Sequence, residues 1–445
     1  MRHLRFSIAN ITSIANVANI ANIAGIAVVL ATALLSPRPA SAALFELFQH
    51  GGRATGQAGA FTARAADPSA VFYNPAAITK LQGTQVEAGL DFTNPQDEYR
   101  SATGNFKAHH VINFPPAAYV THHFGNGSPV AVGLGLDSPY WNDLNWDDAL
   151  FPGRFLDRRF RLEVVELHPV LGWEVTDDLS VGGGLRYLYG TLEQADNGLM
   201  QVFIPGGPLP AVEVQRDAET KVHKLAWDLA VHYVRPAWGW GAVFRSAAKL
   251  SGTGDATYEA RDVPAIPGLA EALAARLTNG RASQSFELPD ELRGGFWFAP
   301  YPELRVELDA SYDRWSQVGD DVITYTPDAF RNGPSVRPRR WDNTLSLRLG
   351  VEGNVTDNFL LHGGFGIEPS PVSSGTIEPG FPQGDVKVYS FGFTYNLPQM
   401  SFDVGYSLHQ GDARGATGQE LLNPAVTSRY SARDQVWAGS LRWRF

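Results

Sequence analysis

The chain has 445 residues, a formal net charge of −10 and no cysteine, and 44% of its residues are hydrophobic. The absence of cysteine excludes a disulfide framework and a cysteine-based metal site, and the acidic balance argues against a nucleic-acid partner. A soluble chain of this length usually divides into two or three domains, but no composition shift marks such a boundary here.

Residues 1–42 have the features of a secretory signal peptide. Arg2 and Arg5 form a positive start, residues 23–35 form an apolar core, and Ala-Ser-Ala at 40–42 is a cleavage site. The alternative is a membrane helix, but such a helix needs about 20 apolar residues. We therefore expect a secreted chain in which no later segment is a membrane helix.

Residues 43–83 differ from everything that follows them. They are rich in glycine and alanine and show no sustained alternation of apolar and polar residues. The rest of the chain does alternate, which predicts β-strands. A non-alternating block that precedes a long series of strands indicates an N-terminal hatch, or plug, followed by a barrel that occupies residues 84–445.

The strands are identified by period-2 alternation. Met400, Phe402 and Val404, for example, share one face, and Ser401 and Asp403 share the other. About fourteen strands are expected, an even number as in bacterial single-chain barrels. Their predicted ranges are 84–92, 115–124, 129–138, 161–175, 178–194, 219–234, 237–255, 283–298, 303–316, 341–354, 357–367, 385–397, 400–410 and 430–445.

The predicted connections alternate between short and long. The first, 93–114, is long and the second, 125–128, is short, and this order continues to the end of the chain. Short periplasmic turns and long extracellular loops are the pattern of outer-membrane barrels. The last strand ends at Phe445, the usual signal for the barrel-assembly machinery, which we therefore expect as a partner.

Three short runs in the hatch carry a family resemblance. Gly-Arg-Ala-Thr-Gly-Gln-Ala-Gly at 52–59, Ala-Ala-Asp-Pro at 65–68 and Asn-Pro-Ala at 74–76 resemble the hatch of the FadL family. These proteins are outer-membrane transporters of long-chain fatty acids and other hydrophobic compounds. The resemblance implies an all-β membrane fold: an antiparallel outer-membrane barrel of about 14 strands with the hatch inside its lumen.

The same resemblance implies a function without catalysis. We expect a monomeric channel for passive uptake of a hydrophobic ligand, with no enzyme activity, cofactor or metal, surrounded by outer-membrane lipid and lipopolysaccharide. Long-chain fatty acids are the first candidate ligand, and aromatic or aliphatic hydrocarbons are the second. The rival interpretations are an outer-membrane lipid hydrolase and a loop-based adhesin or receptor, although the chain contains no G-x-S-x-G and no H-E-x-x-H motif.

The resemblance also assigns roles to residues of the hatch and of the third strand. In the family the ligand leaves sideways through a kink in the third strand, and here Gly133, Gly135, Asp137 and Pro139 are the candidates for that opening. Glycines inside a strand mark bulges or close backbone approach, or they merely relieve crowding. The hatch candidates are Asn74, which is expected to hold the third strand through its amide, and its neighbours Pro75 and Ala76. A simple turn at this point is the alternative.

The loop predicted at 139–160 is the candidate surface for ligand capture. Exposed apolar side chains on a solvent loop usually bind something, but the loops could instead bury them against one another. A short amphipathic helix is expected at 269–277, packed against this loop. The lumen-facing charges are expected to form a network across the barrel. The capture candidates are Trp141, Leu144, Trp146, Leu150 and Phe151.

Overall fold

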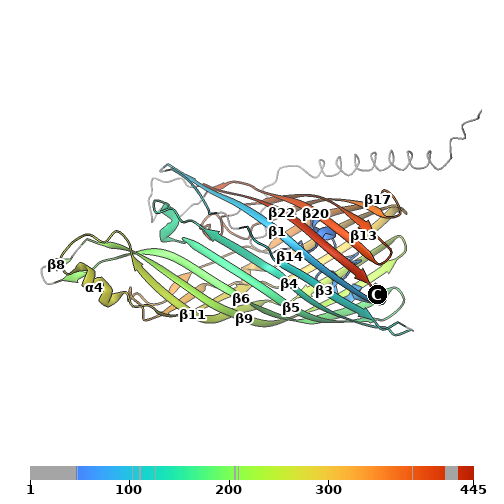
Figure 1. Cartoon of the computed structure of the whole chain (residues 1–445), viewed down its shortest axis with the longest axis horizontal. Coiled ribbons are helices and arrows are strands. Elements are labelled where there is room, and N and C mark those ends of the chain that lie inside the picture. Colours follow the sequence, from blue (N-terminus) through green and yellow to red (C-terminus); the bar gives the residue numbers. More distant parts are fainter. Residues whose placement is uncertain are drawn as a thin grey trace, which may run out of the picture.

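The computed structural model describes residues 47, 49–102, 104–109, 112–125, 127–204, 207–208, 210–382, 384–415 and 429–445. The predicted signal peptide, 1–42, lies outside these residues. Strands dominate the chain and form one closed antiparallel barrel (Figure 1). Closure is made by β1 and β22, which pair from Gln85 opposite Arg444 to Arg100 opposite Arg429.

The predicted strand count is confirmed. Fourteen strands cross the barrel, if β10 with β11 and β12 with β13 are each counted as one interrupted strand. This count is justified because β9 pairs with both β10 and β11, and these pair in turn with β13 and β12. The fourteen are β1 (Thr84–Ser101), β3 (Pro116–His123), β4 (Val130–Asn145), β5 (Arg159–Glu174), β6 (Leu179–Met200), β9 (Val212–Arg235), β10 (Trp238–Arg245) with β11 (Ala248–Ala260), β12 (Gly280–Leu288) with β13 (Glu291–Tyr301), β14 (Leu304–Asp313), β17 (Thr344–Asn354), β18 (Phe359–Glu368), β19 (Val386–Asn396), β20 (Met400–Gly411) and β22 (Arg429–Arg444).

The alternation in the sequence places apolar side chains on the outside of the barrel. On β19, Phe391 and Tyr395 are exposed, whereas Ser390 and Thr394 are buried on the lumen side. This is the arrangement of a barrel whose outer face contacts lipid. No helix among the described residues is long and apolar enough to cross a membrane.

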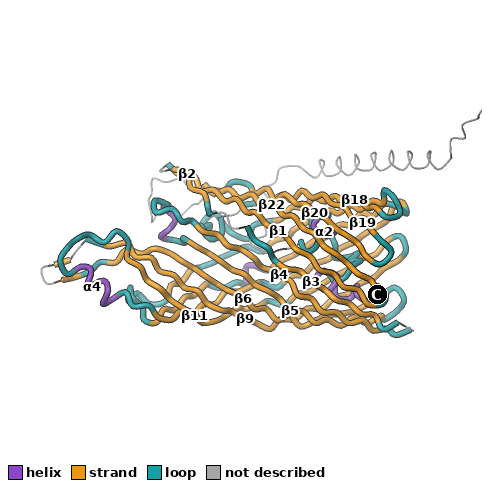
Figure 2. Tube along the Cα trace, in the orientation of Figure 1, coloured by secondary structure: helices purple, strands orange, loops and turns teal. Residues whose placement is uncertain are grey.

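On one side of the barrel the strands continue far beyond the rim. β6 and β9 have 22 and 24 residues, and with β11 and β12 they form the protruding sheet at the left of Figures 1 and 2. The predicted helix is confirmed as α4 (Leu269–Arg276). It packs on this sheet, where Leu269 and Leu273 join an apolar cluster with Tyr258 and Tyr325, and not on the loop after β4 as expected. The smaller strands are β2 (Gly104–Lys107), β7 (Phe203–Ile204), β8 (Gly207–Pro208), β15 (Asp321–Thr326), β16 (Ser335–Arg337) and β21 (Arg414–Gly415).

The connection predicted at 139–160 is shorter than expected. β4 runs on to Asn145 and β5 begins at Arg159, so the connection keeps only a short turn of helix, η2 (Pro152–Phe155). Another such turn, η3 (Trp315–Gln317), follows β14. Alternation alone did not reveal the extra length of β4, because the strand changes register between Asp137 and Tyr140.

The hatch lies inside the barrel. It contains α2 (Gly52–Thr55), α3 (Ala70–Tyr73) and η1 (Pro75–Lys80). Phe61, Phe72 and Ile78 are fully buried in a cluster shared with the inner faces of β3, β4 and β5. The hatch segment therefore packs directly on the barrel wall.

Candidate functional site

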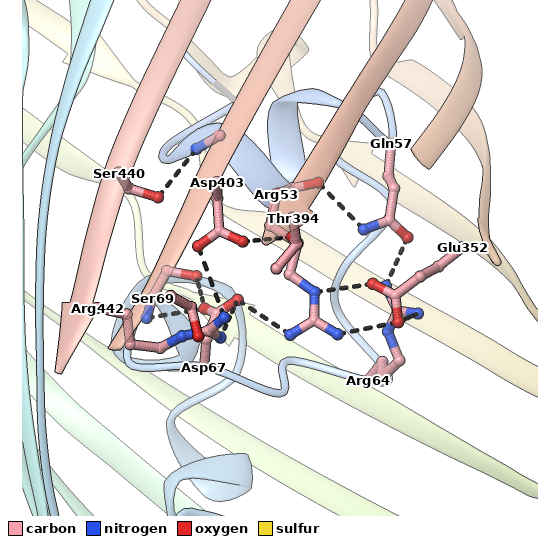
Figure 3. Close-up of polar contacts among 12 residues, drawn as sticks. Arg53, Gln57, Arg64, Asp67, Ser69, Glu352, Thr394, Asp403, Ser440 and Arg442 are labelled. Carbon is pink, nitrogen blue, oxygen red and sulfur yellow. Dashed lines mark hydrogen bonds and ion pairs between the residues drawn. The ribbon is translucent and has the colours of Figure 1, made fainter. Parts of the chain in front are cut away.

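Two arginines of the hatch, Arg53 partly buried and Arg64 buried, bind the barrel wall through one carboxylate. Arg53 donates two hydrogen bonds, of 2.8 and 2.9 Å, to the two carboxylate oxygens of Glu352 on β17. Arg64 approaches the same carboxylate at 3.1 Å (Figure 3). Burial by itself lowers the pKa of the Arg53 guanidinium, but the attraction of Glu352 outweighs it and raises that pKa above its usual value. Glu352 is thus the main counter-ion of Arg53.

Carboxylates of the wall also bind the hatch backbone. Asp309 on β14 accepts hydrogen bonds from the backbone N–H groups of Phe61 and Thr62, at 3.0 and 2.9 Å. Glu307 accepts one from Ala63 at 2.7 Å. The expected network across the lumen is therefore in large part a set of contacts to the hatch, which the sequence did not indicate because these partners lie more than 240 positions apart.

Asn74 is fully buried and uses both ends of its side-chain amide. Its Nδ2 donates to the backbone oxygens of Thr62, at 3.0 Å, and of Val231 on β9, at 3.2 Å. Its Oδ1 accepts from the Ala76 N–H at 3.1 Å, which caps η1, and Pro75 occupies the first position of that helix. The expected contact of Asn74 with the third strand is wrong: the amide binds β9. The hatch reaches the third strand, β4, through Val71 and Leu47.

Replacing Asn74 tests this anchoring. Asn74→Ala removes all three hydrogen bonds of the side-chain amide, at a cost of about 1–3 kcal/mol. Asn74→Asp keeps the cap on Ala76 but cannot donate to Val231. We expect both variants to lower the thermal stability of the folded barrel, measured by heat-dependent gel mobility, with Asn74→Asp the less stable because its carboxylate would be buried against the Thr62 and Val231 oxygens. Equal stability of Asn74→Ala and wild type would contradict the anchoring role.

The barrel wall is interrupted beside the hatch. β3 is short and pairs with β4 only as far as Ala118 opposite Leu136. Beyond Leu136 the edge of β4 that faces β3 has, among the described residues, one isolated bridge, between Asn145 and His109. At the same point the pairing of β4 with β5 shifts register. The wall therefore has a break next to the kinked segment of β4.

The predicted third-strand residues surround this break. The register shift falls at Ser138 and Pro139, and the Pro139 carbonyl accepts a hydrogen bond from the Leu47 N–H at 2.9 Å. Gly133 and Gly135 lie in the regular part of β4, before the register shift, and their part in a lateral opening stays a prediction. A Cβ placed at Gly135 would lie 2.9 Å from a methyl carbon of Val71, and Gly133 is equally close. These glycines admit the hatch side chain, so the kink lies after them.

The lumen above the hatch contains a large apolar cluster. It is built from inward-facing residues of β1, β4, β5, β6, β9, β11, β12 and β22 and from the loops that cover them, and we call it the apolar chamber. Tyr140 of β4, next to the break, belongs to it, as does Tyr99 of β1, which pairs with Phe106 of β2. Its members are Tyr99, Phe106, Ala108, Tyr140, Leu144, Trp146, Phe151, Phe160, Leu162, Val164, Leu188, Leu192, Val222, Ala226, Ala248, Leu250, Phe286, Leu288, Trp315, Val318, Trp341, Val372, Ile377, Phe381 and Tyr430.

The predicted capture residues are divided between this chamber and the surface. Trp146 and Phe151 stack at 4.7 Å between ring centroids and are buried, and Leu144 is buried beside them. The expectation that these three are exposed is wrong, because the loops fold inward over the lumen. Leu150 is 77% exposed, as expected, and Trp141 is half-buried on β4. Their part in ligand capture stays a prediction.

Comparison with known proteins gives a consistent result. The alkane uptake protein A of Marinobacter nauticus is 22% identical over 408 residues, which cover 85% of this chain and 86% of that protein. Among solved structures, a Pseudomonas aeruginosa FadL homologue superimposes with a TM-score of 0.78 at 18% identity, covering 90% of this chain and 99% of that one. The Pseudomonas putida toluene transporter TodX superimposes with a TM-score of 0.71 at 14% identity, again covering 90% and 99%.

The match to a family model covers nearly the whole chain. The model is described as outer membrane protein transport protein (OMPP1/FadL/TodX) and matches residues 33–445. Proteins of this family are transport channels and not enzymes, in agreement with the plugged barrel described above. The chain is therefore a member of the OMPP1/FadL/TodX family of outer-membrane transport proteins.

Proposed function

We propose that the protein takes up hydrophobic small molecules by passive diffusion and releases them sideways through the wall break into the bilayer. The ligand enters the apolar chamber from the extracellular side. The hatch closes the lumen below the chamber, so the break beside β4 is the exit. The observation that carries the proposal is that β4, whose edge is open at the break, contributes Tyr140 and Leu144 to the chamber.

The chamber suits ligands with long apolar or aromatic parts. Aromatic side chains provide large apolar contact areas, and burying alkyl groups against them is favourable at roughly 25 cal/mol per Å². Long-chain fatty acids, which the sequence favours, and hydrocarbons, which relatives named for alkane and toluene uptake favour, both meet this requirement. Release into lipid suits either class, because neither has a favourable path through water.

A reversible crosslink between the hatch and β4 tests the exit. The chain has no cysteine, so Val71→Cys with Gly135→Cys introduces a single pair. The Cβ position at 135 is 2.9 Å from a Val71 methyl carbon, which is close enough for a disulfide. Uptake of labelled hexadecane and of labelled hexadecanoic acid is measured in cells lacking their own transporter. We expect uptake to fall to the empty-vector level under oxidising conditions and to recover with reductant.

The two single-cysteine variants are the controls, and their uptake should not respond to reductant. Unchanged uptake by the crosslinked protein would contradict an exit that needs the hatch to move away from β4. If wild-type protein at full surface expression imports neither ligand, the transport proposal fails for both classes, and a receptor function of the loops takes its place.

A further inference from the structure

A cavity of about 460 Å³ lies beneath the hatch, at the end of the barrel that carries the short turns. The hatch forms one side of it, and β9, β13, β14, β17, β18 and β19 form the other. Among the described residues that line it, four cations face two carboxylates. Lys80 is already bound to Glu174 at 2.7 Å, so the three arginines are the main positive charges of the cavity. The ionic residues of the lining are Arg53, Arg64, Lys80, Arg305, Glu352 and Asp357.

The three arginines of the cavity share one carboxylate. Arg53 donates a hydrogen bond to each oxygen of Glu352, and Figure 3 shows Arg53 and Arg64 beside that carboxylate. Nη1 of Arg64 and Nη1 of Arg305 approach its Oε1 at 3.1 and 3.7 Å, but neither of them hydrogen-bonds to it. One carboxylate therefore cannot satisfy the three guanidinium groups around it.

Arg64 and Arg305 have N–H groups left without an acceptor. Arg64 donates through Nη2 to the Gln57 side chain. Its Nε, 3.8 Å from Glu307, is buried and has no hydrogen-bond partner among the described residues. Arg305 has no hydrogen bond to any described residue, and 32% of its side chain is exposed. Since a guanidinium group carries five N–H donors in a planar fork, both arginines have donors available beside the cavity.

The other carboxylates near this part of the hatch are engaged elsewhere. Glu307 and Asp309 accept hydrogen bonds from backbone N–H groups of the hatch. Asp67 lies between Arg53 and Arg442, at 3.7 and 3.6 Å. None of these three carboxylates lines the cavity. An acceptor for the free donors of the cavity would therefore have to come from solution.

We propose that the cavity binds a small oxyanion from the periplasm, such as inorganic phosphate, which bridges Arg64 of the hatch and Arg305 of the wall and locks the hatch in place. The two Nη1 atoms are within about 7 Å of each other, because both approach the same oxygen of Glu352. Charge-assisted N–H···O bonds are about 2.7–2.9 Å long, so one tetrahedral anion can accept from both. Three guanidinium groups would then surround two anionic groups.

The barrel wall separates this cavity from the bilayer, so the anion is a soluble one and not a lipid headgroup. The cavity and the apolar chamber lie on opposite sides of the hatch. The lock therefore acts on the hatch from the periplasmic side, whichever hydrophobic compound the protein transports.

Binding of radiolabelled inorganic phosphate to the purified protein in detergent, measured by equilibrium dialysis, tests the site. Wild type should bind phosphate saturably. Arg305→Gln should weaken binding by at least about tenfold, because it removes charge-assisted hydrogen bonds, and Arg305→Lys, which keeps the charge, should bind more tightly than Arg305→Gln. Arg235→Gln is the matched control: Arg235 ends β9 at the same end of the barrel but does not line the cavity. No saturable binding by wild type, or wild-type affinity in Arg305→Gln, overturns the site.

Trypsin cleavage after Arg53 and Arg64 tests the lock, at a temperature at which the hatch is slowly cleaved in chloride. At a phosphate concentration about ten times the dissociation constant, cleavage should be about tenfold slower than in chloride of equal ionic strength, because the anion binds only the seated hatch. Arg305→Gln should be cleaved at the same rate in both salts. Phosphate binding that leaves the cleavage rate of wild type unchanged would overturn the lock.

Discussion

Glu352→Gln should release the hatch from the barrel. The substitution keeps the shape of the side chain but removes the charge that faces Arg53 at 2.8 Å and Arg64 at 3.1 Å. Glu352 is fully buried, so both guanidinium groups would be left without their main partner. Breaking a buried ion pair in this way costs about 3–5 kcal/mol. We expect the hatch to be displaced in a large fraction of molecules while the barrel stays folded.

Two measurements report whether the hatch is displaced, and neither requires that the transported ligand be known. Single-channel recordings in planar bilayers should show larger and more frequent openings in Glu352→Gln than in wild type. Trypsin should cleave after Arg53 and Arg64, which are inaccessible in the seated hatch. Glu303→Gln, an exposed residue of a periplasmic turn, is the control and should behave as wild type. Wild-type conductance and protease resistance in Glu352→Gln would show that Glu352 does not hold the hatch.

A pair of neighbouring glycines on β18 should respond in opposite ways to the same substitution. Gly364 faces the lumen, and a Cβ there would lie 2.5 Å from the backbone nitrogen of Ala58 in the hatch. Gly363 faces outward, and no atom lies within 4 Å of its Cβ position. Gly364→Ala should destabilise the seated hatch by about 1–3 kcal/mol through overpacking. Gly363→Ala should leave the stability of the barrel unchanged or raise it by about 0.4–1 kcal/mol, because alanine lowers the conformational entropy of the unfolded chain.

Thermal unfolding by heat-dependent gel mobility and trypsin access to the hatch measure this pair. Gly364→Ala should expose the hatch and lower the unfolding temperature, and Gly363→Ala should do neither. The comparison is internal, because the two sites share a strand, a residue type and a depth in the barrel. Shifts of the same sign at both positions would mean that the inward glycine is not required for seating the hatch.

Local sequence patterns determine much of the structure of this protein. Alternation specifies which side chains face lipid, because strand geometry turns every second residue outward, and the alternating loop lengths specify which end faces the cell exterior. Thus Phe391 and Tyr395 were assignable to one face of a strand from the alternation alone. Asn74 and Pro75 likewise form a helix start from local rules alone.

Contacts across the lumen were decided only by the tertiary structure. The sequence indicates that Glu352 faces inward, but not that Arg53 meets it, because that depends on the path of the hatch through the lumen. For the same reason Asn74 binds Val231 on β9 instead of the third strand. Trp146 and Phe151 are buried because the loop folds over the barrel mouth. The break beside Asp137 exists because β3 begins only at Pro116 and β4 shifts register. The pairing between strands depends on the closed barrel, and no single strand encodes it.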